Sequence, residues 1–126
     1  MNIRYMRFAG AGLAALVAAA HVFVGTFDTL VPLLDSDLAL PVKGTFHACW
    51  HFISIVLIVS VWAFAKGTAL ARPIAWLWIA FGICFVAAGI FGAGIDGIVA
   101  VPQWVLLVPV GVLVLITQTG PTREGR

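Results

Sequence analysis

Four long stretches of this 126-residue chain contain no charged side chain, and they constrain its fold more than any other feature. The stretches cover residues 8–27, 44–65, 73–95 and 97–122. Each is about as long as the roughly 20 residues that a helix needs to cross a bilayer core of about 30 Å. Charged residues make up only 10% of the chain, against about 25% in typical soluble domains. The sequence therefore predicts an all-α integral membrane protein.

The spacing of these stretches predicts a single domain over residues 1–126, built as an up-and-down bundle of four transmembrane helices. The expected spans are residues 8–25, 44–65, 73–93 and 101–119. Residues 26–43 mix aspartates with apolar residues and are expected to form a connector that lies over the outer end of the bundle. Short turns join the other spans, so consecutive helices are expected to run antiparallel.

The basic residues predict how the bundle is oriented, because lysine and arginine gather on the cytoplasmic side of a membrane. Six of the seven basic residues fit an arrangement with both termini cytoplasmic, and Lys43 is the exception. We therefore expect a cell membrane protein of the bacterial inner membrane type. The tryptophans at the ends of the spans agree with this orientation. They are expected to mark the inner interface (Trp62, Trp76, Trp78) and the outer interface (Trp50, Trp104).

The first span also has features of a secretory signal peptide. Arg4 and Arg7 precede an apolar stretch, and the alanines at 18–20 resemble an A-x-A cleavage site. Cleavage there would remove the span and leave His21 as the first residue. Because the apolar pattern continues to Phe27, we expect the span to be retained as a helix.

Several classes of function lack the residues they need. The basic residues form no patch interleaved with aromatic side chains, so nucleic acid is not an expected partner. The chain has no glycine-rich phosphate loop, no G-x-S-x-G motif and no paired carboxylates placed for acid and base catalysis. Cys49 and Cys84 lie in different spans without C-x-x-C spacing, so we interpret them as small apolar residues. Whether the chain is an enzyme is left open.

Histidines supply the candidate site. The chain has three, His21, His47 and His51, and all are expected in the outer third of the first two spans. His47 and His51 are four residues apart, a spacing that places two imidazoles on one face of a helix, and His21 lies at a compatible depth on the neighbouring helix. Polar side chains at such depth usually face the interior of a bundle. The pattern predicts a transition metal ion bound by His21, His47 and His51.

Other polar and aromatic residues near the outer face are candidates to complete or to orient this site. The candidates for a further ligand are Asp28, Asp96 and Gln103, and the residues expected beside the ligands are Ser54, Trp50 and Trp104. Imidazole ligands suit zinc, copper and iron, and the pattern does not choose among these metals.

Five other interpretations of the chain are left open. Histidines from adjacent helices also suit the two axial positions of a non-covalently bound haem b, or they would donate hydrogen bonds to a lipid or quinone headgroup. The chain would equally serve as a non-enzymatic accessory subunit of a larger membrane complex, or as a homo-oligomer, because small residues in its first and third spans permit close helix packing. In the simplest interpretation the histidines are neutral and only hold the helices together through hydrogen bonds.

Overall fold

The computed structural model describes residues 3–118, and this part of the chain is helical apart from short turns and contains no strand. A first helical rod runs continuously through α1 (Ile3–Ala19), the π-helical segments η1 (Ala20–Val24) and η2 (Thr26–Leu30), and α2 (Val31–Asp35). The remaining elements are α3 (Leu40–Lys66), α4 (Ala71–Ala93), η3 (Gly94–Asp96), α5 (Gly97–Ala100) and α6 (Trp104–Thr117).

The described residues form four helical rods, and three of them are long and apolar enough to cross a membrane. These three cover Ile3–Asp35, Leu40–Lys66 and Ala71–Ala100. The prediction of an all-helical bundle is therefore confirmed for the described residues, and three of the four expected spans are long and apolar enough to cross a membrane.

The fourth expected span, residues 101–119, is shorter in the structure. Helix α6 has 14 residues, which corresponds to about 21 Å at 1.5 Å per residue, less than the roughly 30 Å of a bilayer core. Val101 has a non-helical ψ of 73° because the ring of the following Pro102 crowds it out of the α-helical region. Helix α6 consequently begins only at Trp104, and residue 119 lies outside the described range.

The connector predicted over residues 26–43 is wrong in its extent. Helix continues to Asp35 and resumes at Leu40, which leaves residues 36–39 as the only non-helical link. Pro32 does not end the rod, and it lies where the π-helical segment η2 gives way to α2. The Lys43 ammonium donates to the Leu34 carbonyl at 2.7 Å and so satisfies an end of the rod. The segment lengthens the bundle instead of covering it.

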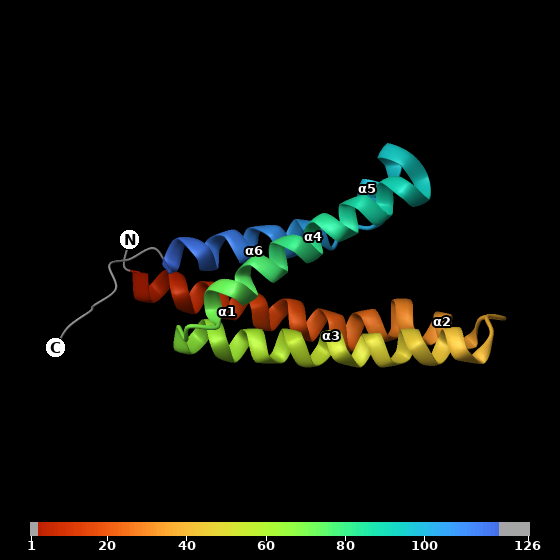
Figure 1. Ribbon diagram of the computed structural model, residues 1–126, viewed down its shortest axis with the longest axis horizontal. Coiled ribbons are helices and arrows are strands. Elements are labelled where there is room, and N and C mark those ends of the chain that lie inside the picture. Colours follow the sequence, from red (N-terminus) through yellow and green to blue (C-terminus); the bar gives the residue numbers. More distant parts are fainter. Residues whose placement is uncertain (1–2, 119–126) are drawn as a thin grey trace.

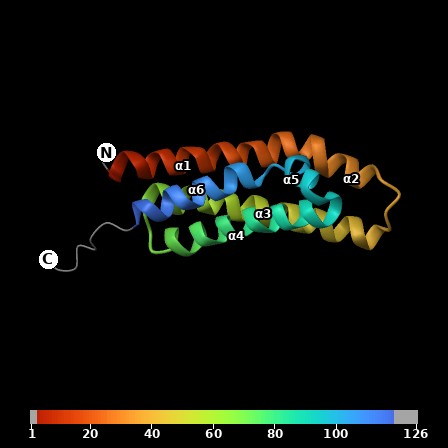
Figure 2. The same cartoon turned by 90° about the horizontal axis from the view of Figure 1, so that it is seen from above.

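The rods are arranged as two antiparallel pairs (Figures 1 and 2). Helix α1 packs mainly on α3, helix α4 packs mainly on α6, and contact between α1 and α6 joins the pairs. The two pairs are closest at the end that holds the start of α1 and the turn between α3 and α4, and they diverge toward α5 (Figure 1). We call the first end the inner end and the second the outer end.

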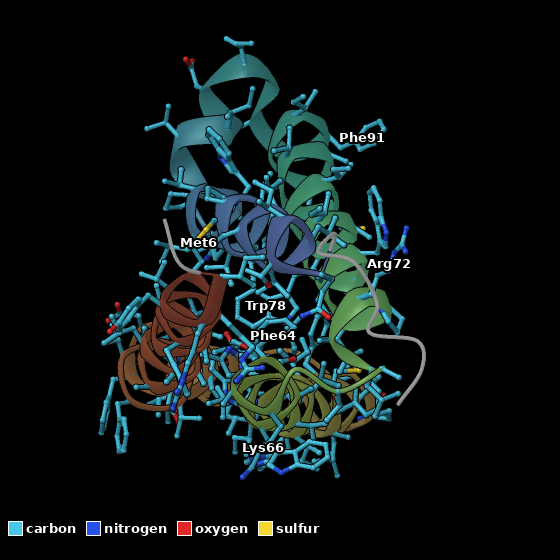
Figure 3. All side chains as sticks on the ribbon, turned by 90° about the vertical axis from the view of Figure 1, so that its left-hand side faces the viewer. Met6, Phe64, Lys66, Arg72, Trp78 and Phe91 are labelled. Atoms are coloured by element: carbon cyan, nitrogen blue, oxygen red, sulfur yellow. The ribbon has the colours of Figure 1, made fainter. Side chains whose placement is uncertain are left out.

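The packed core lies near the inner end and is centred on Trp78. This side chain is 0% exposed, and its ring meets that of Phe64 edge to face with centroids 5.7 Å apart (Figure 3). Its indole N–H donates to the Ser60 hydroxyl at 2.9 Å, and that hydroxyl donates to the Val56 carbonyl at 2.6 Å. The prediction that Trp78 marks the membrane interface is therefore wrong, because the indole is enclosed between α3 and α4 with its polar atom satisfied.

The turn at the inner end is tight because α3 ends at a glycine in the left-handed region. Gly67 has φ 63° and its N–H donates to the carbonyls of Ala63 and Phe64. A Cβ at Gly67 would lie 2.8 Å from Nη1 of Arg7, so the arginine of α1 packs directly over this turn. The start of the first helix thereby packs against the turn that joins α3 to α4.

Candidate functional site

His47 and His51 form a close pair on the surface of α3. Their Nε2 atoms are 3.0 Å apart and their ring centroids are 4.8 Å apart. Both side chains are exposed, and the unbroken helix from Leu40 to Lys66 holds them one turn apart on the same face. Without another ligand, one neutral ring donates an N–H to the other, so the pair holds one proton between two converging nitrogens.

His21 makes a different contact, with Trp50 of the neighbouring helix. The imidazole stacks on the indole with centroids 4.1 Å apart and an angle of 20° between the planes. Its Nε2 lies 3.3 Å from the Trp50 carbonyl oxygen, the distance of a weak hydrogen bond that the ring donates. His21 is half-buried, unlike the two exposed histidines. It therefore joins η1 to α3 through both its ring face and its polar edge.

Trp50 has a defined position between the two helices. A Cβ at Gly25 would lie 2.8 Å from Cη2 of Trp50, so the indole edge rests on bare backbone of the first rod. The Ser54 hydroxyl donates to the Trp50 carbonyl at 3.0 Å, the same oxygen that His21 faces. His21 and Gly25 are about one π-helical turn apart. The imidazole of His21 and the bare backbone of Gly25 therefore lie on the same side of the first rod, and both contact Trp50.

The three predicted ligands do not form one group in the structure. Among residues 3–118, no set of three or more His, Cys, Asp or Glu side chains is close enough together to hold a metal ion. The structure brings His47 and His51 together, and it places the polar edge of His21 against a carbonyl. Asp28, Asp96 and Gln103, the candidates for a further ligand, are exposed.

The residues expected beside the ligands divide in the same way. Ser54 and Trp50 lie beside His21, because the Ser54 hydroxyl and the His21 imidazole both face the carbonyl oxygen of Trp50. Trp104 lies elsewhere, where its indole N–H donates to the Ile98 carbonyl at 3.0 Å and holds α5 against the start of α6.

The role of Gly25 was missed by sequence reasoning. Its spacing of four residues from His21 was visible, but an α-helix gives no reason to connect a glycine there with a tryptophan on another helix. The two π-helical segments that create this arrangement have no signal in the sequence that we recognise.

The separation of the two Nε2 atoms can be compared with that of two nitrogen ligands on one ion. Two nitrogens bound to one ion at 2.0–2.1 Å are separated by about 2.9 Å at a right angle and about 3.4 Å at the tetrahedral angle. The observed Nε2 separation of 3.0 Å falls within this range. The same separation is also that of an N–H···N hydrogen bond, so an ion would require both rings to turn until their lone pairs meet at one point beside the line between the nitrogens.

Comparison with protein-family models, curated proteins and solved structures finds no match for this chain.

Proposed function

We propose that this protein is a multi-pass protein of the cell membrane that binds a transition metal ion near its outer face, with His47 and His51 as ligands. The observation that carries the proposal is the 3.0 Å separation of the two Nε2 atoms on an exposed helix face. Imidazole is a ligand for zinc, copper and iron, and the proposal extends to each of these ions.

The proposed orientation has both termini in the cytoplasm, as in a bacterial inner membrane protein. Arg4, Arg7, Lys66 and Arg72 belong to the inner end, and the aspartates at 28, 35, 37 and 96 belong to the outer end. Because basic residues are retained on the cytoplasmic side, this separation of charge supports an inner end that faces the cytoplasm.

The depth of the pair agrees with access from the outer water. Along α3, His51 is about 22 Å and His47 about 28 Å from Lys66, at 1.5 Å per residue. With Lys66 at the inner surface of a bilayer core of roughly 30 Å, His47 reaches the outer headgroups and His51 lies one turn deeper. An ion would enter from outside without crossing the apolar core.

His21 has a structural role in this proposal. Its Nε2 faces the Trp50 carbonyl, and its ring supports the indole that packs on Gly25. Since Trp50 lies between His47 and His51 in the sequence, this contact fixes the segment of α3 that carries both proposed ligands. His21 then affects metal binding only through the position of that helix.

Zinc binding by detergent-purified protein tests the proposal, with free Zn²⁺ set by a competing chelator and bound zinc measured by elemental analysis. We expect His47→Ala and His51→Ala each to weaken binding at least about tenfold, because each removes a ligand. We expect His21→Phe, which retains an aromatic ring against Trp50, to change the affinity by less than about threefold. Equal losses in all three variants, or no zinc bound by the unsubstituted protein, would contradict the proposal.

A further inference from the structure

The histidine pair is an incomplete metal site within a single chain. Zinc in a closed protein site is bound tetrahedrally by about four ligands, and the pair supplies two imidazoles. In the described range 3–118, no third His, Cys, Asp or Glu joins them. Among the described residues there is no further ligand of these types, which leaves water or another molecule as a source.

The pair lies on a helix face that the chain itself leaves uncovered. With about 100° per residue, one side of α3 carries a set of exposed residues: Leu40, Gly44, His47, Ala48, His51, Ile55, Ile58 and Trp62. We call this set the histidine face. Polar side chains that face lipid within a membrane are costly and usually face protein or water instead. The histidine face is therefore better matched to a protein partner than to lipid chains.

Small residues beside the histidines permit a close approach. Gly44 and Ala48 are four apart on the histidine face, the spacing at which membrane helices pack with their backbones near each other. A Cβ at Gly44 would meet no atom within 4 Å, so the space above this glycine is open in the single chain. A second helix can approach there without displacing a side chain of the first.

Membrane topology makes a second copy the partner that completes the site. Copies of one chain insert in the same orientation, so a symmetric pair is related by a twofold axis along the membrane normal. Each residue at such an interface then meets its own copy at the same depth. His47 and His51 of one copy would face His47 and His51 of the other, which supplies about four imidazoles within one helical turn. No other class of partner brings the missing ligands by symmetry alone.

We infer that two copies of this protein pair through the histidine face of α3 and share one four-imidazole zinc-type metal site on the twofold axis. The inference rests on the proposed function, because it takes His47 and His51 to be metal ligands.

Metal stoichiometry and mass, measured together in detergent, test the inference. The probe is Zn²⁺ added to chelator-stripped protein, with bound zinc determined by elemental analysis and protein mass by light scattering after size exclusion. We expect about half an equivalent of zinc per chain in a zinc-dependent dimer, and a monomer after EDTA treatment.

Two glycine variants separate the interface from the ligands. Gly44→Leu fills the open space on the histidine face while keeping both histidines, and it is expected to stay monomeric and to bind zinc at least about tenfold more weakly. Gly12→Leu is the matched control, because a Cβ at Gly12 in α1 also meets nothing within 4 Å. It is expected to dimerise and to bind zinc as the unsubstituted protein does. Circular dichroism checks that both variants keep their helices.

The outcomes distinguish this inference from the proposed function. One zinc per monomer, lost in His47→Ala, would overturn the shared site and leave the proposed function standing. Absence of histidine-dependent zinc binding would overturn both. Zinc-dependent dimers that Gly44→Leu leaves unchanged would overturn the assignment of the interface to the histidine face.

Discussion

The two halves of α3 differ in how they are held. All four buried residues of this helix, Leu57, Ser60, Ala63 and Phe64, lie in its inner half. There it packs against the first rod and against Trp78 of α4. The outer half has no buried residue, and its most specific interhelical contacts are those of Trp50 with His21 and Gly25.

This difference separates the part of the helix that specifies the fold from the part that presents side chains. In the inner half, each polar group of the Trp78 network has a partner within the chain. In the outer half, the two histidines bond only each other and face outward. Substitutions should therefore change stability mainly in the inner half and binding mainly in the outer half.

The largest expected effect is the loss of the central indole. Trp78→Ala should lower the free energy of unfolding by roughly 3 to 5 kcal/mol, because it leaves a cavity among fully buried neighbours. Trp76→Ala is the matched control on the same helix, since Trp76 is 56% exposed. Thermal denaturation in detergent, followed by circular dichroism, measures both variants. Equal destabilisation would show that the inner half is not the packed region described above.

The next effect isolates the hydrogen bond from the packing. Ser60→Ala removes the acceptor of the Trp78 indole N–H, and leaving that group buried without a partner should cost about 1 to 3 kcal/mol. Ser54→Ala is the control near the middle of α3, where the hydroxyl donates only to a carbonyl of its own helix, and should cost less than about 1 kcal/mol. The same thermal measurement ranks the two serines. The reverse order would contradict the contrast between the halves.

A smaller effect is expected in the outer half of α3, where the Trp50 indole packs on Gly25. Gly25→Ala places a methyl group against the Trp50 indole and should cost about 1 to 2 kcal/mol, because the ring must move from its position. Gly12→Ala, in open space on the same rod, should be neutral or slightly stabilising, since alanine favours helix more than glycine does. Hydrogen exchange of the outer half of α3 should increase in the first variant only.

The smallest expected effect on stability lies at the histidine pair. In the absence of metal, the double change of His47 and His51 to alanine should alter the free energy of unfolding by less than about 1 kcal/mol, because both side chains are exposed. With excess Zn²⁺ the unsubstituted protein should melt at a higher temperature and the double variant should not. This zinc-dependent gain should diminish on acidification, because imidazole must be neutral to bind metal. A zinc-dependent gain that survives the double change would place the metal elsewhere.

The sequence predicts the fold class because long uncharged stretches permit few structures other than membrane helices. It does not predict where the helices end at the outer side. Residues 26–43 were interpreted as a connector, yet the first rod continues through η2 and α2 to Asp35. Conversely, Pro102 shortens the last helix through its effect on Val101.

The candidate site was predictable only in part. The four-residue spacing of His47 and His51 within a continuous helix predicts that they lie close together, and in the structure their Nε2 atoms are 3.0 Å apart. Whether His21 reaches His47 and His51 depends on how the first rod is rotated about its axis relative to α3. The spacing of residues along each helix does not determine that rotation. The π-helical turn at 20–24 rotates His21 onto Trp50, and the same packing turns the histidine face outward.

X-ray absorption at the zinc edge of the loaded protein reports the atoms bound to the metal, and so it tests whether His47 and His51 are ligands. We expect about four nitrogen ligands near 2.0 to 2.1 Å with the outer-shell scattering of imidazole rings, and the loss of that signal in the double alanine variant of His47 and His51. Sulfur ligands, or a nitrogen and oxygen shell without imidazole scattering, would contradict it.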